Sequence, residues 1–260
     1  MKQFACLLVL FTTLTRVLAG WTPPTNPDPE KILNEAQADA AAGKYEDALA
    51  KHIWFHQNAL KYESALYGVR LSFALSYWLK LGEAYPPALE KLKSIRDETG
   101  EGIRRKTSKD SSQDFHDFES INRELKEESK TKELFFWLDS NQPEVAEKVF
   151  KIAEPVLISA KEYKLCGKYV NPDQAFQWAV EHYRGDKRLA NDPKFGKRHK
   201  EYGEKSFSNR TTTLVALLVI NGRKADADRI VGEATKEWDD PKFKKELEKA
   251  LGGEVPAPWP

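Results

Sequence analysis

The sequence predicts an all-α protein in which antiparallel helical hairpins, about 10–12 helices in total, stack on one another. Apolar residues recur at three-to-four spacing along most of the chain, as they do on one face of an amphipathic helix. No convincing run alternates apolar and polar residues with period two, the pattern of a half-buried strand. Glycine and proline stand at the ends of the periodic segments, where short turns between helices are expected.

The expected helices follow one another closely along the chain. Leu71, Leu75 and Trp78 illustrate the helical spacing. Pro86 and Pro87 suit the first turn of a helix, whereas Pro155 is expected to break one. In chain order, the predicted helices cover residues 30–42, 45–62, 64–81, 87–97, 114–128, 130–139, 144–164, 173–183, 208–221, 224–238 and 241–251.

Composition divides the chain into segments. Thr99–Gln113 is polar and lacks an apolar period, which predicts a long loop between two lobes, and Arg184–Lys205 is charged and poorly periodic. The predicted segments are a signal peptide (1–19), a proline-rich lead-in (20–29), N-terminal helical repeats (30–98), the polar loop (99–113), C-terminal helical repeats (114–251) and a tail (252–260).

The first 19 residues have the pattern of a secretory signal peptide. A basic start precedes the apolar run Phe4–Leu14, and Val17–Ala19 forms a small-x-small cleavage site, so cleavage is expected after Ala19. The alternative is a retained anchor, but the run is shorter than the roughly 20 residues that a bilayer requires. We therefore expect a secreted or periplasmic protein with no membrane span after signal removal.

The charge balance argues against nucleic acid as a partner. The chain has 41 basic and 40 acidic residues, and only Lys2 and Arg16 fall within the predicted signal. The remainder is close to neutral, unlike proteins that bind a polyanion. Cys6 also lies in the signal, which leaves Cys166 without a disulfide partner in the chain, either as a reactive thiol or as buried filler at a helix end.

A six-residue turn recurs three times in altered form. Gly or Asn ends one helix in a left-handed conformation, and five residues later a small alanine lets the next helix approach closely. The residues four and seven positions beyond each alanine are also mostly apolar. The repeated turn positions are Gly43 and Ala48, Asn141 and Ala146, and Gly222 and Ala227.

These positions resemble the second helix of the tetratricopeptide repeat. The three turns start at residues 43, 141 and 222, further apart than the roughly 34-residue step of a regular array. The copies are therefore degenerate and interrupted. The resemblance implies a helical solenoid that offers a groove to another protein or a peptide. Another array of helical hairpins is the alternative.

His52 and His56 are the strongest candidates for chemistry. They are four residues apart, which places both imidazoles on one helix face, as in a two-histidine metal clip. A metal needs at least a third ligand, and residue 53 is Ile where a hydrolytic His-Glu-x-x-His motif has Glu. The competing interpretation is packing, since His52 stands where the other copies have Phe150 and Val231.

No catalytic motif appears elsewhere. The sequence has no glycine-rich phosphate loop and no Gly-x-Ser-x-Gly elbow, so no catalytic residue and no cofactor is expected. We expect an exported, non-enzymatic helical-repeat protein that binds a protein or peptide as a scaffold or adaptor. The alternatives are a metal-dependent protein using His52 and His56, and a self-assembling structural protein of the cell envelope.

Overall fold

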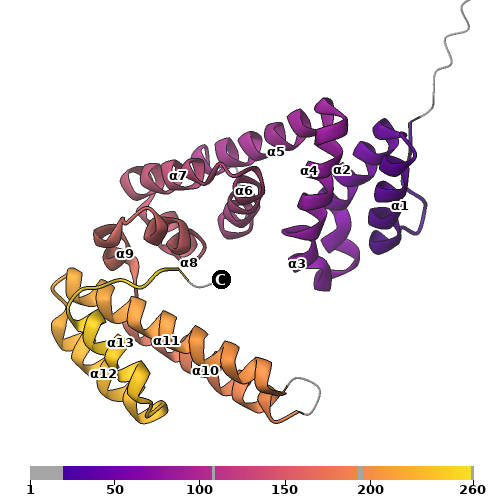
Figure 1. Cartoon of the computed structure of the whole chain (residues 1–260). Coiled ribbons are helices and arrows are strands. Elements are labelled where there is room, and N and C mark those ends of the chain that lie inside the picture. The colour runs from indigo at the N-terminus through magenta and orange to yellow at the C-terminus, as the bar shows by residue number, and fades with distance from the viewer. Residues whose placement is uncertain (1–19, 107–108, 193–195, 259–260) are drawn as a thin grey trace, which may run out of the picture. The chain divides into compact units, whose positions relative to one another are not determined.

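The computed structural model describes residues 20–106, 109–192 and 196–258 (Figure 1). The predicted signal peptide and its cleavage site lie outside these residues. The described residues form thirteen α-helices and one short 3₁₀ helix, with no strand, and this confirms the all-α prediction. The helices are α1 (Pro29–Ala41), α2 (Tyr45–Tyr62), η1 (Ser64–Leu66), α3 (Tyr67–Arg70), α4 (Phe73–Ala84), α5 (Pro86–Arg104), α6 (Ser111–Leu125), α7 (Glu128–Asn141), α8 (Pro143–Ser159), α9 (Tyr163–Tyr169), α10 (Pro172–Ala190), α11 (Gly196–Ile220), α12 (Lys224–Glu237) and α13 (Pro241–Leu251).

The chain divides into two compact units, Met1–Leu92 and Lys93–Pro260. In the first unit α1, α2 and α4 pack around a core that includes Leu33, Phe55 and Ala59. In the second unit α6–α13 pack around a larger core that runs from Phe115 to Ala250. Within the described ranges, none of the helices combines the length and the apolar character needed to cross a bilayer.

The predicted loop at 99–113 is mostly helix. Helix α5 continues to Arg104 and α6 begins at Ser111, so only the segment around residues 105–110 connects them. The helix was not predicted because this segment is polar and few of its residues are buried. Ile103 is 1% exposed, and Gly100 packs so closely on Phe118 that a Cβ at residue 100 would lie 2.8 Å from the Phe118 ring. The boundary between the two units falls earlier, at Leu92 and Lys93 within α5.

Three other boundaries also differ from the prediction. Helix α8 runs through Pro155 without a break, and the chain turns instead at 160–162. The predicted helix 64–81 is divided into η1, α3 and α4. Most of the charged stretch 184–205 is helical, in α10 and α11. The exposed faces of these helices are polar, so the sequence shows no clear apolar period there. Their buried residues include Tyr183 and Phe207, whose rings stack with centroids 4.7 Å apart.

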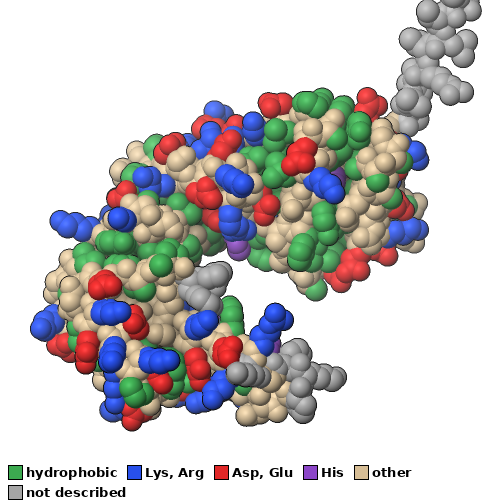
Figure 2. All heavy atoms as spheres, in the orientation of Figure 1, with side chains coloured by type: hydrophobic (Ala, Val, Ile, Leu, Met, Phe, Trp, Pro, Cys, Tyr) green, Lys and Arg blue, Asp and Glu red, His purple; other side chains and the backbone are tan. Residues whose placement is uncertain are grey.

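Positive and negative side chains are interspersed over the surface that Figure 2 shows. Neither sign forms a continuous patch on that face. On this face, therefore, positive and negative side chains lie close to one another, as the nearly equal numbers of basic and acidic residues in the sequence allow.

Candidate functional site

His52 and His56 lie in α2 against one tryptophan. Their ring centroids are 5.7 and 6.1 Å from that of Trp78 in α4, with His52 stacked and His56 edge-on. Both histidines are buried, and Trp78 Nε1 donates to the Ala88 carbonyl at 2.9 Å. This cluster packs α2 against α4.

The His52 ring is buried without a hydrogen bond. Neither ring nitrogen has a partner among the described residues. Burial lowers the pKa of His52 to about 4, because the charged imidazolium would lose its hydration. The described chain also holds no group of three or more His, Cys, Asp and Glu side chains arranged to bind a metal. The third ligand that the metal hypothesis requires is thus not found in these ranges.

Gly43 and Gly222 take the left-handed conformation at the ends of α1 and α11, with φ of 76° and 72°. In each turn the next residue's N–H bonds back five residues, Lys44 to Asp39 and Arg223 to Leu218, both at 2.8 Å. This is the Schellman motif, which satisfies the carbonyls at a helix end. Ala48, which opens α2, is fully buried, as are the two corresponding alanines, Ala146 and Ala227.

The prediction for Asn141 was wrong in its geometry. Asn141 is the last residue of α7, and its cap, Gln142, has φ of −145°, so no left-handed residue ends this helix. Pro143 starts α8 immediately, which leaves no room for the longer turn. Gln142 is the structurally important residue instead: it is buried, and its Nε2 donates to the Arg104 carbonyl at 2.8 Å, closing the end of α5.

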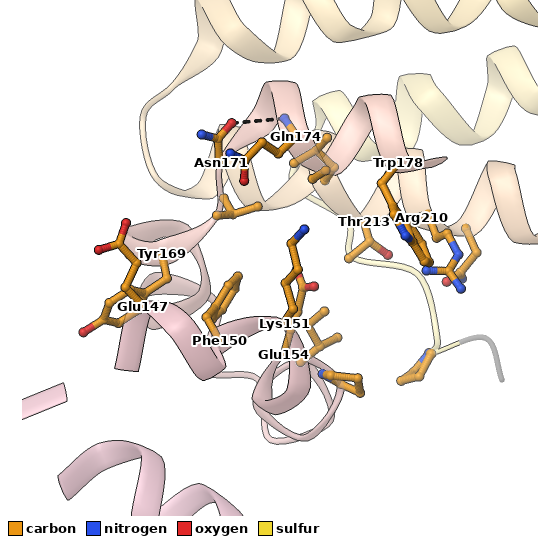
Figure 3. A pocket seen from close by; sticks show the side chains of 17 residues that line it. Glu147, Phe150, Lys151, Glu154, Tyr169, Asn171, Gln174, Trp178, Arg210 and Thr213 are labelled. Atoms are coloured by element: carbon orange, nitrogen blue, oxygen red, sulfur yellow. Dashed lines mark hydrogen bonds between the residues drawn. The ribbon is translucent and has the colours of Figure 1, made fainter. Parts of the chain in front are cut away.

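The second unit contains a pocket that the sequence did not predict. Its volume is about 600 Å³, and α8, the α9–α10 connection, α10, α11 and the tail form its walls (Figure 3). This volume is within the range of small-ligand and peptide-side-chain sites. The pocket is lined by Glu147, Phe150, Lys151, Glu154, Pro155, Ile158, Tyr169, Val170, Asn171, Gln174, Ala175, Trp178, Asn209, Arg210, Thr213, Leu214 and Pro258.

One end of the pocket is a cation–aromatic pair. The Arg210 guanidinium lies 4.0 Å from the centre of the Trp178 ring, and Arg210 Nε donates to Ser206 Oγ at 3.0 Å. Trp178 is 37% exposed, and its ring centroid also lies 3.8 Å from that of His182. Figure 3 shows the two side chains side by side, with Lys151 pointing into the pocket from α8. A flat, polarisable surface next to positive charge suits aromatic and carbonyl groups of a ligand.

Glu154 is the pocket residue whose pKa lies near neutral pH. Desolvation raises the pKa of its carboxyl to about 7, against the opposing influence of the Arg210 and Lys151 charges. The carboxyl can therefore accept or donate a hydrogen bond near neutral pH, depending on its protonation state. Cys166 lies close enough for the Glu154 charge to add to burial, which raises the pKa of the thiol to about 12. A fully buried thiol with this pKa is filler rather than a nucleophile.

The chain's own tail forms one side of the pocket. Val255 packs against the core of the second unit, Asn209 Nδ2 donates to the Ala257 carbonyl at 2.8 Å, and Pro258 lines the cavity. The pocket therefore has a proline of the chain's own tail as part of its lining.

Sequence reasoning did not identify this pocket; of its lining residues it named Phe150 for its place in the repeat and Pro155 as an expected helix break. One signal was available: Glu147, Lys151 and Glu154 follow one another at four- and three-residue spacing, a row of charge on a helix. Nothing in the sequence placed that row opposite Arg210 and Trp178, because the pairing depends on the packing of α8 with α9–α11.

Comparison with protein-family models, with curated proteins and with solved structures finds no match to this chain. Function is therefore inferred from the pocket itself.

Proposed function

We propose that this chain is a non-enzymatic helical-repeat protein that binds an extended segment of another protein in the pocket of its second unit. The observation that carries the proposal is the tail: Pro258 lines the pocket, and the tail is held through its backbone by the hydrogen bond from Asn209 Nδ2 to the Ala257 carbonyl. A site that holds one such segment has the chemistry to hold another.

Helix packing supports the repeat interpretation. Neighbouring helices contact each other, as in the pairs α1–α2, α7–α8 and α11–α12. Next-but-one helices also contact, as in α6–α8, α9–α11 and α11–α13. Both kinds of contact are expected of stacked hairpins in a tetratricopeptide-like array, which typically presents a peptide groove.

The pocket walls suit the backbone and side chains of an extended peptide. Phe150, Ile158 and Leu214 are apolar, and Trp178 with Arg210 provides a stacking surface. Proline favours such surfaces because its backbone is already extended and loses little entropy on binding. Lys151 is exposed and lines the same pocket, so its ammonium group can bond carbonyl or carboxylate oxygens of a ligand.

The test is a binding screen of short synthetic peptides, with and without proline and tryptophan, against the purified chain. Trp178→Ala and Arg210→Ala should each weaken the selected peptides by about tenfold or more, since buried Trp and Arg contacts dominate binding energies. Phe73→Ala and Arg105→Ala are the matched controls, because both residues are exposed and far from the pocket in sequence. Peptides bound equally by the two pocket variants and the wild type would contradict the proposal.

A further inference from the structure

We propose that the pocket recognises an acidic side chain of the bound segment, whose carboxylate pairs with Arg210 and Lys151 and shares a proton with the Glu154 carboxyl. The inference rests on the proposed function and adds to it the class of ligand and the dependence of binding on pH. All three residues line the cavity, Lys151 and Glu154 from α8 and Arg210 from α11.

The Arg210 guanidinium is held in place by groups that carry no negative charge. Its Nε donates to Ser206 Oγ at 3.0 Å, and its central carbon lies 4.0 Å from the centre of the Trp178 ring. Arg184 of the same unit is held differently, because it donates to the Glu237 carboxylate at 2.6 Å. The bond to Ser206 uses neither Nη1 nor Nη2, so the fork of the Arg210 guanidinium suits a carboxylate from a ligand.

Lys151 and Glu154 bring a second cation and a carboxyl group to the same cavity. They are three residues apart on α8, a spacing that places both side chains on one face of the helix. Figure 3 shows both in the middle of the pocket, between Arg210 at one end and Glu147 at the other. A carboxylate that enters between Lys151 and Arg210 is attracted by both, whereas an ammonium group would be repelled by both.

The Glu154 carboxyl makes this site sensitive to pH. Burial raises its pKa to about 7, although the positive charges of Arg210 and Lys151 act in the opposite direction. In the protonated form its O–H can donate a hydrogen bond to a ligand carboxylate. In the ionised form it would repel the same ligand.

Other titratable groups also surround Glu154 and Arg210. Cys166 and Tyr169 stay protonated near neutral pH, because burial raises the pKa of both, that of the Cys166 thiol to about 12. His182 is different, since a histidine ring commonly titrates near neutral pH, and the test has to separate it from Glu154. The neighbouring groups, from α8, α9, α10 and α11, are Glu147, Cys166, Tyr169, His182, Asp186 and Tyr202.

A bound carboxylate would keep the proton on Glu154. Two carboxylates at close range disfavour each other's ionisation, so the ligand raises the pKa of Glu154 further and binding takes up a proton. Affinity should therefore be nearly constant below the pKa of the free carboxyl and decrease above it. Between pH 6 and pH 8 the expected decrease is about tenfold.

The test uses three synthetic peptides and isothermal titration calorimetry of the full chain at pH 6 and pH 8. The first is acetyl-PLDLP-amide, the second is acetyl-PLNLP-amide, and the third is acetyl-PLNLP with a free C-terminal carboxylate. The aspartate peptide should bind about tenfold or more tightly than the other two at pH 6, because it alone presents a carboxylate on a side chain. Titrations at pH 7.5 in buffers of different ionisation enthalpy should show uptake of more than about half a proton.

Variants of the chain assign the proton. Glu154→Gln should bind the aspartate peptide equally well at pH 6 and pH 8, because the amide donates a hydrogen bond at both values. Glu144→Gln is the matched control, since Glu144 is an exposed glutamate of the same helix outside the pocket lining. His182→Phe tests the neighbouring ring. Both of these variants should keep the tenfold decrease of the wild type.

Equal binding of the aspartate and asparagine amides would overturn the inference. A decrease with pH that persists in Glu154→Gln, or that disappears in His182→Phe, would overturn it as well. So would binding of the free-carboxylate peptide as tightly as the aspartate peptide, because the site would then read the end of a chain. If screened peptides bind through Trp178 and Arg210 without a preference for aspartate, the inference fails and the proposed function stands. If no peptide binds at all, both fail.

Discussion

At the residue scale, His52 shows how a buried side chain can look like a ligand and act as packing. It occupies the position of Phe150 and Val231 in the other copies, it stacks on Trp78, and its two ring nitrogens have no hydrogen-bond partner in the described chain. Burying a polar group without a partner costs about 1–3 kcal/mol. His52 therefore contributes an aromatic packing contact, while its ring N–H donor and its ring nitrogen acceptor stay without hydrogen bonds.

We predict that His52→Phe stabilises the protein by about 1 kcal/mol at pH 7.5, because the unsatisfied nitrogens are removed and the aromatic contact is kept. The folded-state pKa of about 4 lies below the ordinary value of 6.5, so the unfolded chain binds more protons between these values. Stability of the wild type should thus fall as pH decreases from 6.5 toward 4, and the advantage of the variant should grow.

Urea unfolding at pH 7.5 and pH 5 measures both effects. His182→Phe is the control, because His182 is exposed, phenylalanine keeps the ring contact with Trp178, and only an exposed hydrogen bond to the Trp178 carbonyl is lost, so stability should change by less than about 0.5 kcal/mol. A lower unfolding midpoint for His52→Phe than for the wild type would show that the His52 nitrogens have partners in solution.

Three lysines, Lys106, Lys126 and Lys161, occupy the backbone conformation that glycine occupies at Gly43 and Gly222. Lys126 and Lys161 have φ of 57° and 60°, and each lies in a Schellman motif at the end of α6 and α8. A left-handed conformation costs a non-glycine residue about 1–2 kcal/mol. The glycine signal in the sequence therefore could not reveal these two turns, although they are the same structure.

Lys161→Gly should raise the free energy of unfolding by up to about 1 kcal/mol, because it relieves this strain and removes only an exposed side chain. Asn141→Gly is the matched comparison. It should destabilise by up to about 1 kcal/mol, since Asn141 is helical and its side chain bonds to the Trp137 carbonyl. Thermal or urea unfolding of both variants decides the matter, and a gain from Asn141→Gly would contradict the backbone assignment.

At the scale of helices, close approach between α9 and α11 depends on Gly167. A Cβ at Gly167 would lie 1.9 Å from Asn221 Nδ2, which donates to the carbonyls of Tyr163 and Leu217. Asn221 therefore bonds the two helices together only because residue 167 has no side chain. This contact also positions α9 and α11, two of the elements that form the pocket walls.

Gly167→Ala should destabilise the protein by about 1–3 kcal/mol, the usual cost of inserting a methyl group where none fits. Gly232→Ala in α12 should instead stabilise by up to about 1 kcal/mol, because its Cβ would meet no atom within 4 Å and alanine favours the helix. Differential scanning calorimetry of the pair checks the contrast. An unchanged melting temperature for Gly167→Ala would mean that α9 and α11 lie further apart.

Helices were predictable where the apolar period is continuous, as in α2 and α12. They were missed where few residues are buried: the last part of α5 reaches Arg104 with Gly100, which faces Phe118 of α6, and the buried Ile103. The pocket could not be predicted, because Lys151, Trp178 and Arg210 are brought together only by packing between distant segments. Local periodicity contains no information about that packing.

At the scale of the whole chain, the two units carry different features. The first holds the histidine–tryptophan cluster, which is buried, and the second holds the pocket, which is open and lined by mixed chemistry. We therefore assign the candidate binding function to the second unit, whereas His52 and His56, the candidates that the sequence suggested, belong to the first unit.

The most direct test of this assignment is an NMR titration of the ¹⁵N-labelled full chain with the tightest-binding peptide from the binding screen. The account predicts that the shifted amides cluster in Lys151–Ile158, Asn171–Trp178 and Asn209–Leu214, and that the Trp178 indole signal moves with them. Shifts confined to Pro29–Ala84, or the absence of any shift at saturating peptide, would contradict it.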